Sequence, residues 1–192
     1  DGIRDTSVTG VQTCALPIYI RHVTQTGLQN FRRVVLADNA SQSGNSAVEY
    51  TGIPTWCTKI TIVFHDFKLS SNDELKVQLG TSNGIITSGY QSASANQNGN
   101  ATKSMTAGFA IDFNTSNVAF NGKMVIERCS PTSDLWGSEH NGAWAGLGAL
   151  RMGGGTWLKP SSESSREVDR IKMSQESGSG TISGGSVSIW CE

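Results

Sequence analysis

Apolar and polar side chains alternate residue by residue over several short segments, and this period of two constrains the fold more than any other feature. In the stretch Glu-Leu-Lys-Val-Gln-Leu, Leu75, Val77 and Leu79 fall on one face of a pleated strand. No segment sustains the spacing of an amphipathic helix. The chain is therefore expected to be all-β, and the same alternation recurs at Phe109, Ile111, Phe113, Ile60, Ile62, Phe64, Met124, Ile126, Ile171, Met173, Val187 and Ile189.

Between these segments lie stretches rich in glycine and asparagine, which accept the positive φ angles of tight turns. Asn121-Gly122 is the strongest hairpin signal, because type I′ turns favour this dipeptide. Short strands at regular spacing, each with one buried face, predict an antiparallel two-sheet β-sandwich of jelly-roll type. The other stretches expected to form turns are Ser82–Gly84, Asn96–Asn100, Gly153–Gly155 and Gly178–Gly180.

The N-terminal residues are expected to have a different origin from the rest of the chain. Val8–Ile18 matches the translation of a sequencing-library adapter, Asp1–Asp5 matches the outer part of the same oligonucleotide, and Thr6-Ser7 fill the index position between them. Residues 1–18 are therefore expected to carry no native function. Residues 19–30 are interpreted as a linker or junction, and residues 31–192 as the β-sandwich domain.

The charge balance argues against binding to nucleic acids or membranes. The chain has 15 Lys and Arg against 16 Asp and Glu, and without residues 1–18 the two signs are equal. Nucleic acids and anionic membrane surfaces attract clustered positive charge, which is absent here. No apolar run is long enough to span a bilayer, so no membrane insertion is expected.

Three of the four cysteines, Cys57, Cys129 and Cys191, lie outside the adapter segment. Their odd number and wide spacing argue against a disulfide framework and suit a reducing compartment. Cys57 and Cys191 stand among apolar residues, where cysteine behaves as a small buried hydrophobe. Both are therefore predicted to be buried.

No motif for catalysis, a metal or a cofactor stands out, so we predict a non-enzymatic protein without cofactor. Asp112 and Glu127 are expected on separate strands as solvated residues, not as a glycosidase pair. His65 and His140 lack second ligands at metal spacing and are expected at the surface. Asp169-Arg170 is interpreted as a charge pair at a sheet edge or between chains.

The best candidate for a ligand site lies between Ser133 and Trp144. Trp136, Trp144, Asp134 and His140 combine two aromatic rings, an acid and an imidazole, the side chains that grip a sugar by stacking and hydrogen bonding. The alternative is structural, because two tryptophans eight residues apart share one face of a strand and can both point into the core. A ligand site requires at least one of these rings to be exposed.

A series of short motifs, in order and at specific spacing, covers most of the chain from Val34 onward. The motifs are Glu49–Trp56, Lys59–Phe64, Val77–Gly84, Ser88–Tyr90, Thr106–Phe109, Asn121–Met124, Gly153–Gly155, Val168–Met173 and Gly184–Glu192. Together they resemble the C-terminal domain of bacteriophage virion proteins of tail-fibre type, found in marine phages and prophages. Two positions depart from this pattern, Cys57 and Cys191, where the family has a small or aliphatic residue and a nearby tyrosine.

The resemblance implies a virion structural or host-attachment domain, made in the host cytoplasm and incorporated into the virion. It implies self-association, as a homotrimer, together with contacts to other virion proteins and to a host-surface glycan. Two alternatives remain open from the residues. One is a lectin-like carbohydrate-binding module, and the other is a sandwich-fold glycan hydrolase or lyase, which requires convergent ionisable residues in a cleft.

Overall fold

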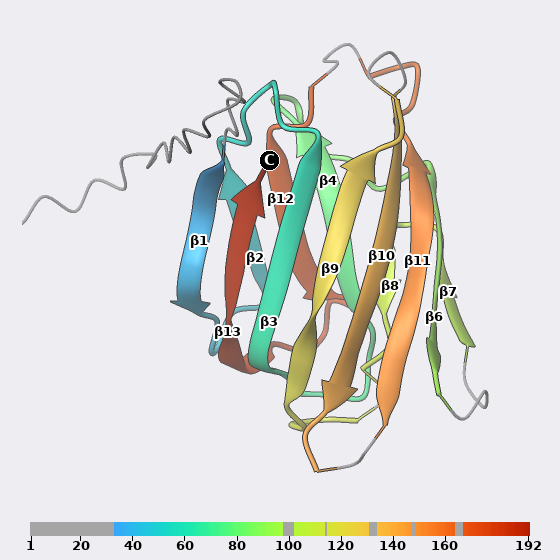
Figure 1. The fold of residues 1–192 in the computed structure, drawn as a ribbon. Helices are drawn as coiled ribbons and strands as arrows, with labels where there is room; N and C mark the ends of the chain where they lie inside the picture. The colour runs from blue at the N-terminus through green and yellow to red at the C-terminus, as the bar shows by residue number, and fades with distance from the viewer. Residues whose placement is uncertain (1–32, 98–101, 114, 131–133, 147–148, 164–166) are drawn as a thin grey trace, which may run out of the picture.

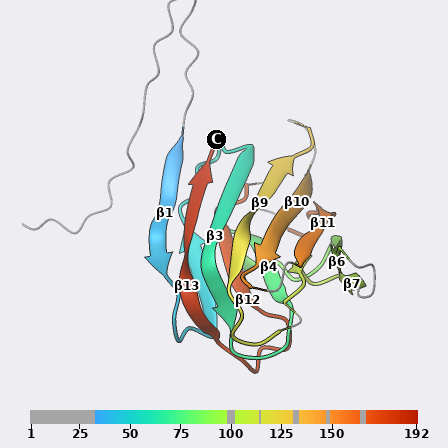
Figure 2. The ribbon, with the colours of Figure 1, turned by 60° about the horizontal axis from the view of Figure 1, so that its bottom comes forward.

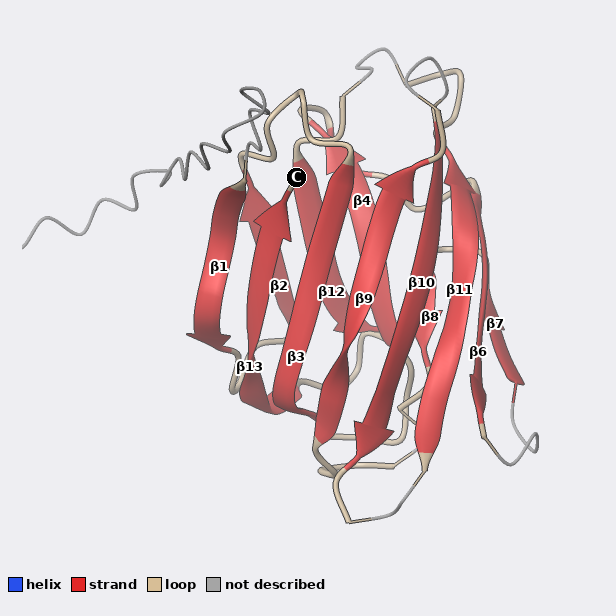
Figure 3. Ribbon diagram, viewed as in Figure 1, coloured by secondary structure: helices blue, strands red, loops and turns tan. Residues whose placement is uncertain are grey.

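The computed structural model describes residues 33–97, 102–113, 115–130, 134–146, 149–163 and 167–192 (Figure 1). These residues form strands and loops without a helix (Figure 3), so none of them forms a helix that could cross a membrane. The predictions for residues 1–18 and 19–30 lie outside the described residues.

The strands of the described chain follow one another with short connections, in keeping with the turn-rich stretches of the sequence. Two of the predicted turns are confirmed, at Ser82–Gly84 and at Gly178–Gly180. The strands are β1 (Val34–Ser41), β2 (Ala47–Thr51), β3 (Lys59–Leu69), β4 (Leu75–Thr81), β5 (Gly84–Ile85), β6 (Tyr90–Asn96), β7 (Thr102–Met105), β8 (Phe109–Ile111), β9 (Phe120–Arg128), β10 (Leu135–Trp144), β11 (Leu150–Leu158), β12 (Arg170–Gln175) and β13 (Ile182–Cys191).

The strands form two antiparallel sheets packed face to face. The larger sheet has the order β1-β13-β3-β9-β10-β11-β6-β7, and the smaller has the order β2-β12-β4-β5 with β8 paired to β4. In two views, β4 and β12 lie behind β3 and β9 (Figure 1 and Figure 2). The predicted all-β, two-sheet antiparallel sandwich is confirmed. The strand order does not confirm the jelly-roll connection.

The core lies between the sheets and is built from the alternating residues. Every residue predicted to face inward from this pattern is buried, with an exposed fraction of 1% or less. Phe64, Phe67, Phe113, Phe120 and Trp144 form a continuous set of rings with neighbouring centroids 5.1 to 6.4 Å apart. Their edge-to-face contacts add to the hydrophobic free energy of burial, which is about 25 cal/mol per Å² of apolar surface.

The hairpin prediction at Asn121-Gly122 is wrong, because both residues lie within β9. Gly122 pairs with Phe64 of β3 on one side and with Gly142 of β10 on the other. A Cβ atom at Gly142 would overlap the ring of Phe120, and one at Gly122 would lie 2.8 Å from the same ring. Glycine is needed here for close packing across central strands, a role that local sequence does not distinguish from a turn.

The turn prediction at Gly153–Gly155 is wrong for the same reason, because all three glycines lie in β11. A Cβ atom at Gly153 would lie 2.6 Å from the ring of His140, and one at Gly155 would lie 2.5 Å from the Cβ atom of Ser92. Because Gly153 and Gly155 of β11 have no side chains, His140 of β10 and Ser92 of β6 have room between the sheets.

Replacing Gly142 with alanine is expected to lower the free energy of unfolding by about 1–3 kcal/mol, because the new methyl group displaces the Phe120 ring. The matched control is Gly184→Ala in β13, where the nearest atom to a Cβ is Lys68 Cδ at 3.8 Å. This control is expected to change the free energy by less than about 0.5 kcal/mol. Urea denaturation of both variants measures the difference, and equal effects would contradict the packing explanation.

Candidate functional site

The two tryptophans of the predicted ligand site are buried in the core. Trp136 and Trp144 lie on the inner face of β10 with exposed fractions of 5% and 2%. Trp144 packs edge-on against Phe113, with ring centroids 5.1 Å apart. Neither ring is available for stacking on a sugar, so the prediction of an aromatic platform is wrong. The structural alternative, two tryptophans on one face pointing into the core, is confirmed.

His140 lies on the same inner face and is 3% exposed, which corrects the prediction of a surface histidine. Its Nε2 atom is 2.9 Å from the hydroxyl oxygen of Ser94. The same hydroxyl oxygen accepts a hydrogen bond from the backbone N–H of Asp112 at 3.0 Å. Burial lowers the pKa of His140 to about 4, because the charged imidazolium is poorly solvated between the sheets. His140 is therefore neutral at physiological pH.

Asp112 is fully buried, which corrects the prediction of a solvated carboxylate. Its Oδ2 atom forms an ion pair with Nε of Arg151, at 3.2 Å. The guanidinium carbon of Arg151 also lies 5.3 Å from the centre of the Trp144 ring. A buried carboxylate needs such a partner, because an isolated charge would cost several kcal/mol to desolvate.

Ser94, His140 and Asp112 have the composition of a hydrolase triad without its accessibility. Ser94 is 1% exposed and His140 is 3% exposed, and both lie in the layer between the sheets. A nucleophile must reach the substrate carbonyl, and its base must be free to exchange a proton. The closed arrangement instead satisfies polar groups within the core and fixes β6 and β10 relative to β8.

Asp134 is the one predicted site residue that lies beside an open surface. It borders a groove of about 900 Å³ at the end of the sandwich where β11 ends and β6 and β10 begin. Such a volume is within the range of small-ligand sites. The residues that line the groove are Ser88, Gly89, Tyr90, Gln91, Asp134, Leu135, Thr156, Leu158, Lys159, Pro160 and Ser161.

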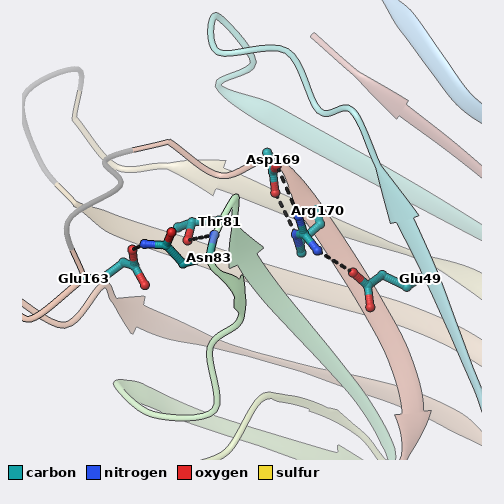
Figure 4. Close-up of polar contacts among 6 residues, drawn as sticks. All are labelled: Glu49, Thr81, Asn83, Glu163, Asp169 and Arg170. Carbon is teal, nitrogen blue, oxygen red and sulfur yellow. Dashed lines mark hydrogen bonds and ion pairs between the residues drawn. The ribbon is translucent and has the colours of Figure 1, made fainter.

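One wall of the groove is held by ionic and polar contacts. Lys159 Nζ lies 3.7 Å from Asp134 Oδ2 and donates a hydrogen bond to the backbone carbonyl of Glu163 at 3.1 Å. The Glu163 side chain in turn accepts a hydrogen bond from Asn83 Nδ2 (Figure 4). The lysine side chain is only 4% exposed, whereas that of Asp134 is 41% exposed. The carboxylate is therefore the member of this pair that a ligand can reach.

The groove combines apolar and polar surface. Leu158 is 57% exposed and pairs across the strands with Leu135, so both lie on the outer face of the larger sheet. Gln91 and Thr156 are also exposed and pair with one another on the neighbouring rung of β6 and β11. This arrangement suits a ligand with one apolar face and several hydroxyl groups. Sequence reasoning missed these residues, although a leucine at an outward position of β11 was a local signal.

Three carboxylates gather where β4 begins and β12 ends. Oxygen atoms of Asp73, Glu74 and Glu176 lie within 4.8 Å of one another, which makes them a possible ligand set for a divalent cation. Lys103 forms an ion pair with Glu74 at 2.8 Å, and Ser177 donates a hydrogen bond to Asp73 at 2.6 Å. Burial and the neighbouring Glu74 raise the pKa of Glu176. These contacts account for the cluster within the protein itself.

The predicted charge pair Asp169-Arg170 is confirmed. Arg170 Nε donates to Asp169 Oδ1 at 2.8 Å, and Arg170 Nη1 donates to Glu49 Oε1 at 3.1 Å (Figure 4). Glu49 lies on β2, one edge strand of the smaller sheet. The arginine therefore joins β12 to the sheet edge through Glu49, while Asp169 holds the other side of the guanidinium group.

Comparison of the chain with known protein families, with curated proteins and with solved structures finds no match.

The buried His140 is expected to make stability depend on pH. Its folded pKa of about 4 lies below the value of about 6.5 in an unfolded chain, so the unfolded state binds more protons between these values. Above pH 6.5, His140 does not reduce the free energy of unfolding. As the pH drops from 6.5 toward 4, His140 is expected to lower the free energy of unfolding by up to ~3 kcal/mol.

This dependence is measured by urea denaturation between pH 4 and 7. His140→Gln is expected to reduce the slope in that window, whereas His65→Gln, at an exposed position of β3, is expected to leave it unchanged. An unchanged slope in the His140 variant would show that other groups dominate the acid sensitivity.

Proposed function

We propose that this chain is a non-enzymatic attachment domain of a bacteriophage virion, of tail-fibre type, that binds a host-surface glycan. The ligand site is the groove bordered by Asp134, Leu158 and Gln91. The observation that supports this proposal is the exposed Leu158 beside a reachable carboxylate, in a groove of about 900 Å³. The resemblance of the sequence motifs to virion proteins supports the proposal that the domain belongs to a virion.

A pyranose ring matches the chemistry of the groove. Its C–H face can pack on Leu158 and Leu135, while its hydroxyl groups can donate to Asp134 and exchange hydrogen bonds with Gln91 and Thr156. Ser88 and Ser161 add hydroxyl groups around the rim. The site therefore contains donors and acceptors for a neutral sugar but few charges, which favours a neutral or weakly basic glycan over a polyanion.

Asp134 is the only carboxyl-bearing side chain lining this groove among the described residues, and the other ionisable side chains there are Lys159 and Tyr90. Retaining and inverting glycosidases use two carboxyl groups on either side of the scissile bond. A single carboxylate paired with a lysine supports binding in preference to glycan hydrolysis.

Binding is tested on a glycan array, followed by calorimetric titration of the best ligand. Leu158→Ala is expected to weaken the affinity about tenfold, because the sugar loses its apolar contact. The control is Leu150→Ala at the opposite end of β11, where the side chain is 43% exposed and outside the groove. Equal loss in both variants, or no binding to any glycan, would contradict the proposed site.

The virion setting is tested by the mass in solution. A homotrimer is expected, with three times the 20.4 kDa of one chain by light scattering coupled to size exclusion. A monomer that binds glycans would instead support a lectin-like carbohydrate-binding module, the alternative function for the same groove.

A further inference from the structure

Two buried cysteines from opposite ends of the described chain lie in contact. Cys57 precedes β3, and Cys191 is the last residue of β13. They are 4% and 0% exposed, which confirms the prediction that both are buried. The side chains of Cys57 and Cys191 are hydrogen-bonded to one another, and the Cys57 thiol donates to the backbone carbonyl of Lys59 at 3.3 Å. Both cysteines are free.

The backbone holds these two thiols together. Cys191 pairs with Ile60 across β13 and β3. Beyond that pair, Glu192 N donates to the Lys59 carbonyl at 2.8 Å, and the Glu192 carbonyl accepts from the N–H groups of Lys59 and Thr58 at 3.0 and 2.9 Å. The residue that follows Cys191 is therefore bound to the two residues that follow Cys57. The two cysteines lie side by side because the hydrogen bonds between β3 and β13 continue to the end of β13.

From this geometry we propose that Cys57 and Cys191 are a disulfide-forming pair, which closes when a low-molecular-weight disulfide such as oxidised glutathione is present. In the reduced protein the pair is two small buried thiols. In the oxidised protein it is a covalent link between the loop before β3 and the end of β13.

Cys57 is only 4% exposed, so the exchange requires a local opening of the loop before β3. It then proceeds through Cys57. The hydrogen bond from Cys191 lowers the pKa of Cys57, and the same bond together with burial raises the pKa of Cys191, so Cys57 is the group that more readily forms the thiolate. Its sulfur attacks oxidised glutathione, whose S–S bond breaks and releases one glutathione. The Cys191 sulfur then attacks the mixed disulfide and releases the second. Two protein thiols are oxidised, one glutathione disulfide is reduced, and the two thiol protons pass to the released glutathione molecules.

The link would act on a long segment of the chain. It joins residues near the two ends of the described domain, and a disulfide that closes a longer loop restricts the unfolded chain more. β13 lies between β1 and β3 in the larger sheet, so the oxidised state fastens an interior strand and not an edge. A protein made in a reducing cytoplasm and released from the cell would gain this link outside it.

The test uses the full chain carrying Cys14→Ser and Cys129→Ser, so that only the pair remains. The folded protein is equilibrated with defined ratios of oxidised to reduced glutathione, quenched with N-ethylmaleimide, digested and analysed by mass spectrometry. We expect a pair of peptides joined by a disulfide bond between Cys57 and Cys191. Neither cysteine is then alkylated, and neither carries glutathione. We also expect the melting temperature of the oxidised form to rise by about 5 °C or more.

Cys57→Ala and Cys191→Ala in the same background are the controls, and each is expected to lose both the link and the rise in melting temperature. The protein that keeps both Cys57 and Cys191 gives the decisive measurement, so the proposal can still be tested if one control variant fails to fold. Two thiols that stay alkylatable at every glutathione ratio would overturn the proposal. So would a stable mixed disulfide, a link between chains, or a link that forms only in urea.

Discussion

The packing of one sheet on the other, through side chains at alternate positions, is the constraint on which the rest of the structure depends. The rings of Phe64, Phe67, Phe113, Phe120 and Trp144 form its centre. Their size requires space on the facing and neighbouring strands, which explains glycine at positions where a Cβ atom would overlap a ring or a backbone carbonyl. The groove and the thiol pair both lie at strand ends whose positions this core fixes.

Beside the aromatic centre, the same inner layer holds a polar network that would be costly if any member lacked a partner. The ion pair of Asp112 with Arg151, and the contact of His140 Nε2 with Ser94, give these buried groups partners, whereas His140 Nδ1 and Trp144 Nε1 have no hydrogen-bond partner within the described residues. The network adds directional contacts between β6, β8, β10 and β11 to the non-directional apolar packing. It therefore specifies strand placement, and it makes the fold sensitive to acid through His140.

Ladder register brings the two proposed functional features to the same end of the sandwich. Cys191 pairs beside the start of β3, the start of β3 pairs with the end of β9, and the end of β9 pairs with the start of β10. The groove begins there, between β10, β11 and β6. The proposed disulfide between Cys57 and Cys191 and the proposed ligand groove would therefore lie at the same end of the larger sheet, on strands that are hydrogen-bonded in one continuous ladder.

The sequence by itself determined the all-β class, the inward face of each alternating strand and the burial of Cys57 and Cys191, because these follow from local periodicity and from side-chain hydrophobicity. It also offered the core as one reading of Trp136 and Trp144, on the ground of their spacing. Only the tertiary structure decided that Gly122 and Gly153 serve close packing, that Asp112 and His140 are buried, and that Asp134 borders a groove with Leu158. The reason is physical: these features depend on which strands become neighbours, and contacts between residues distant in the chain leave no periodic pattern near either partner.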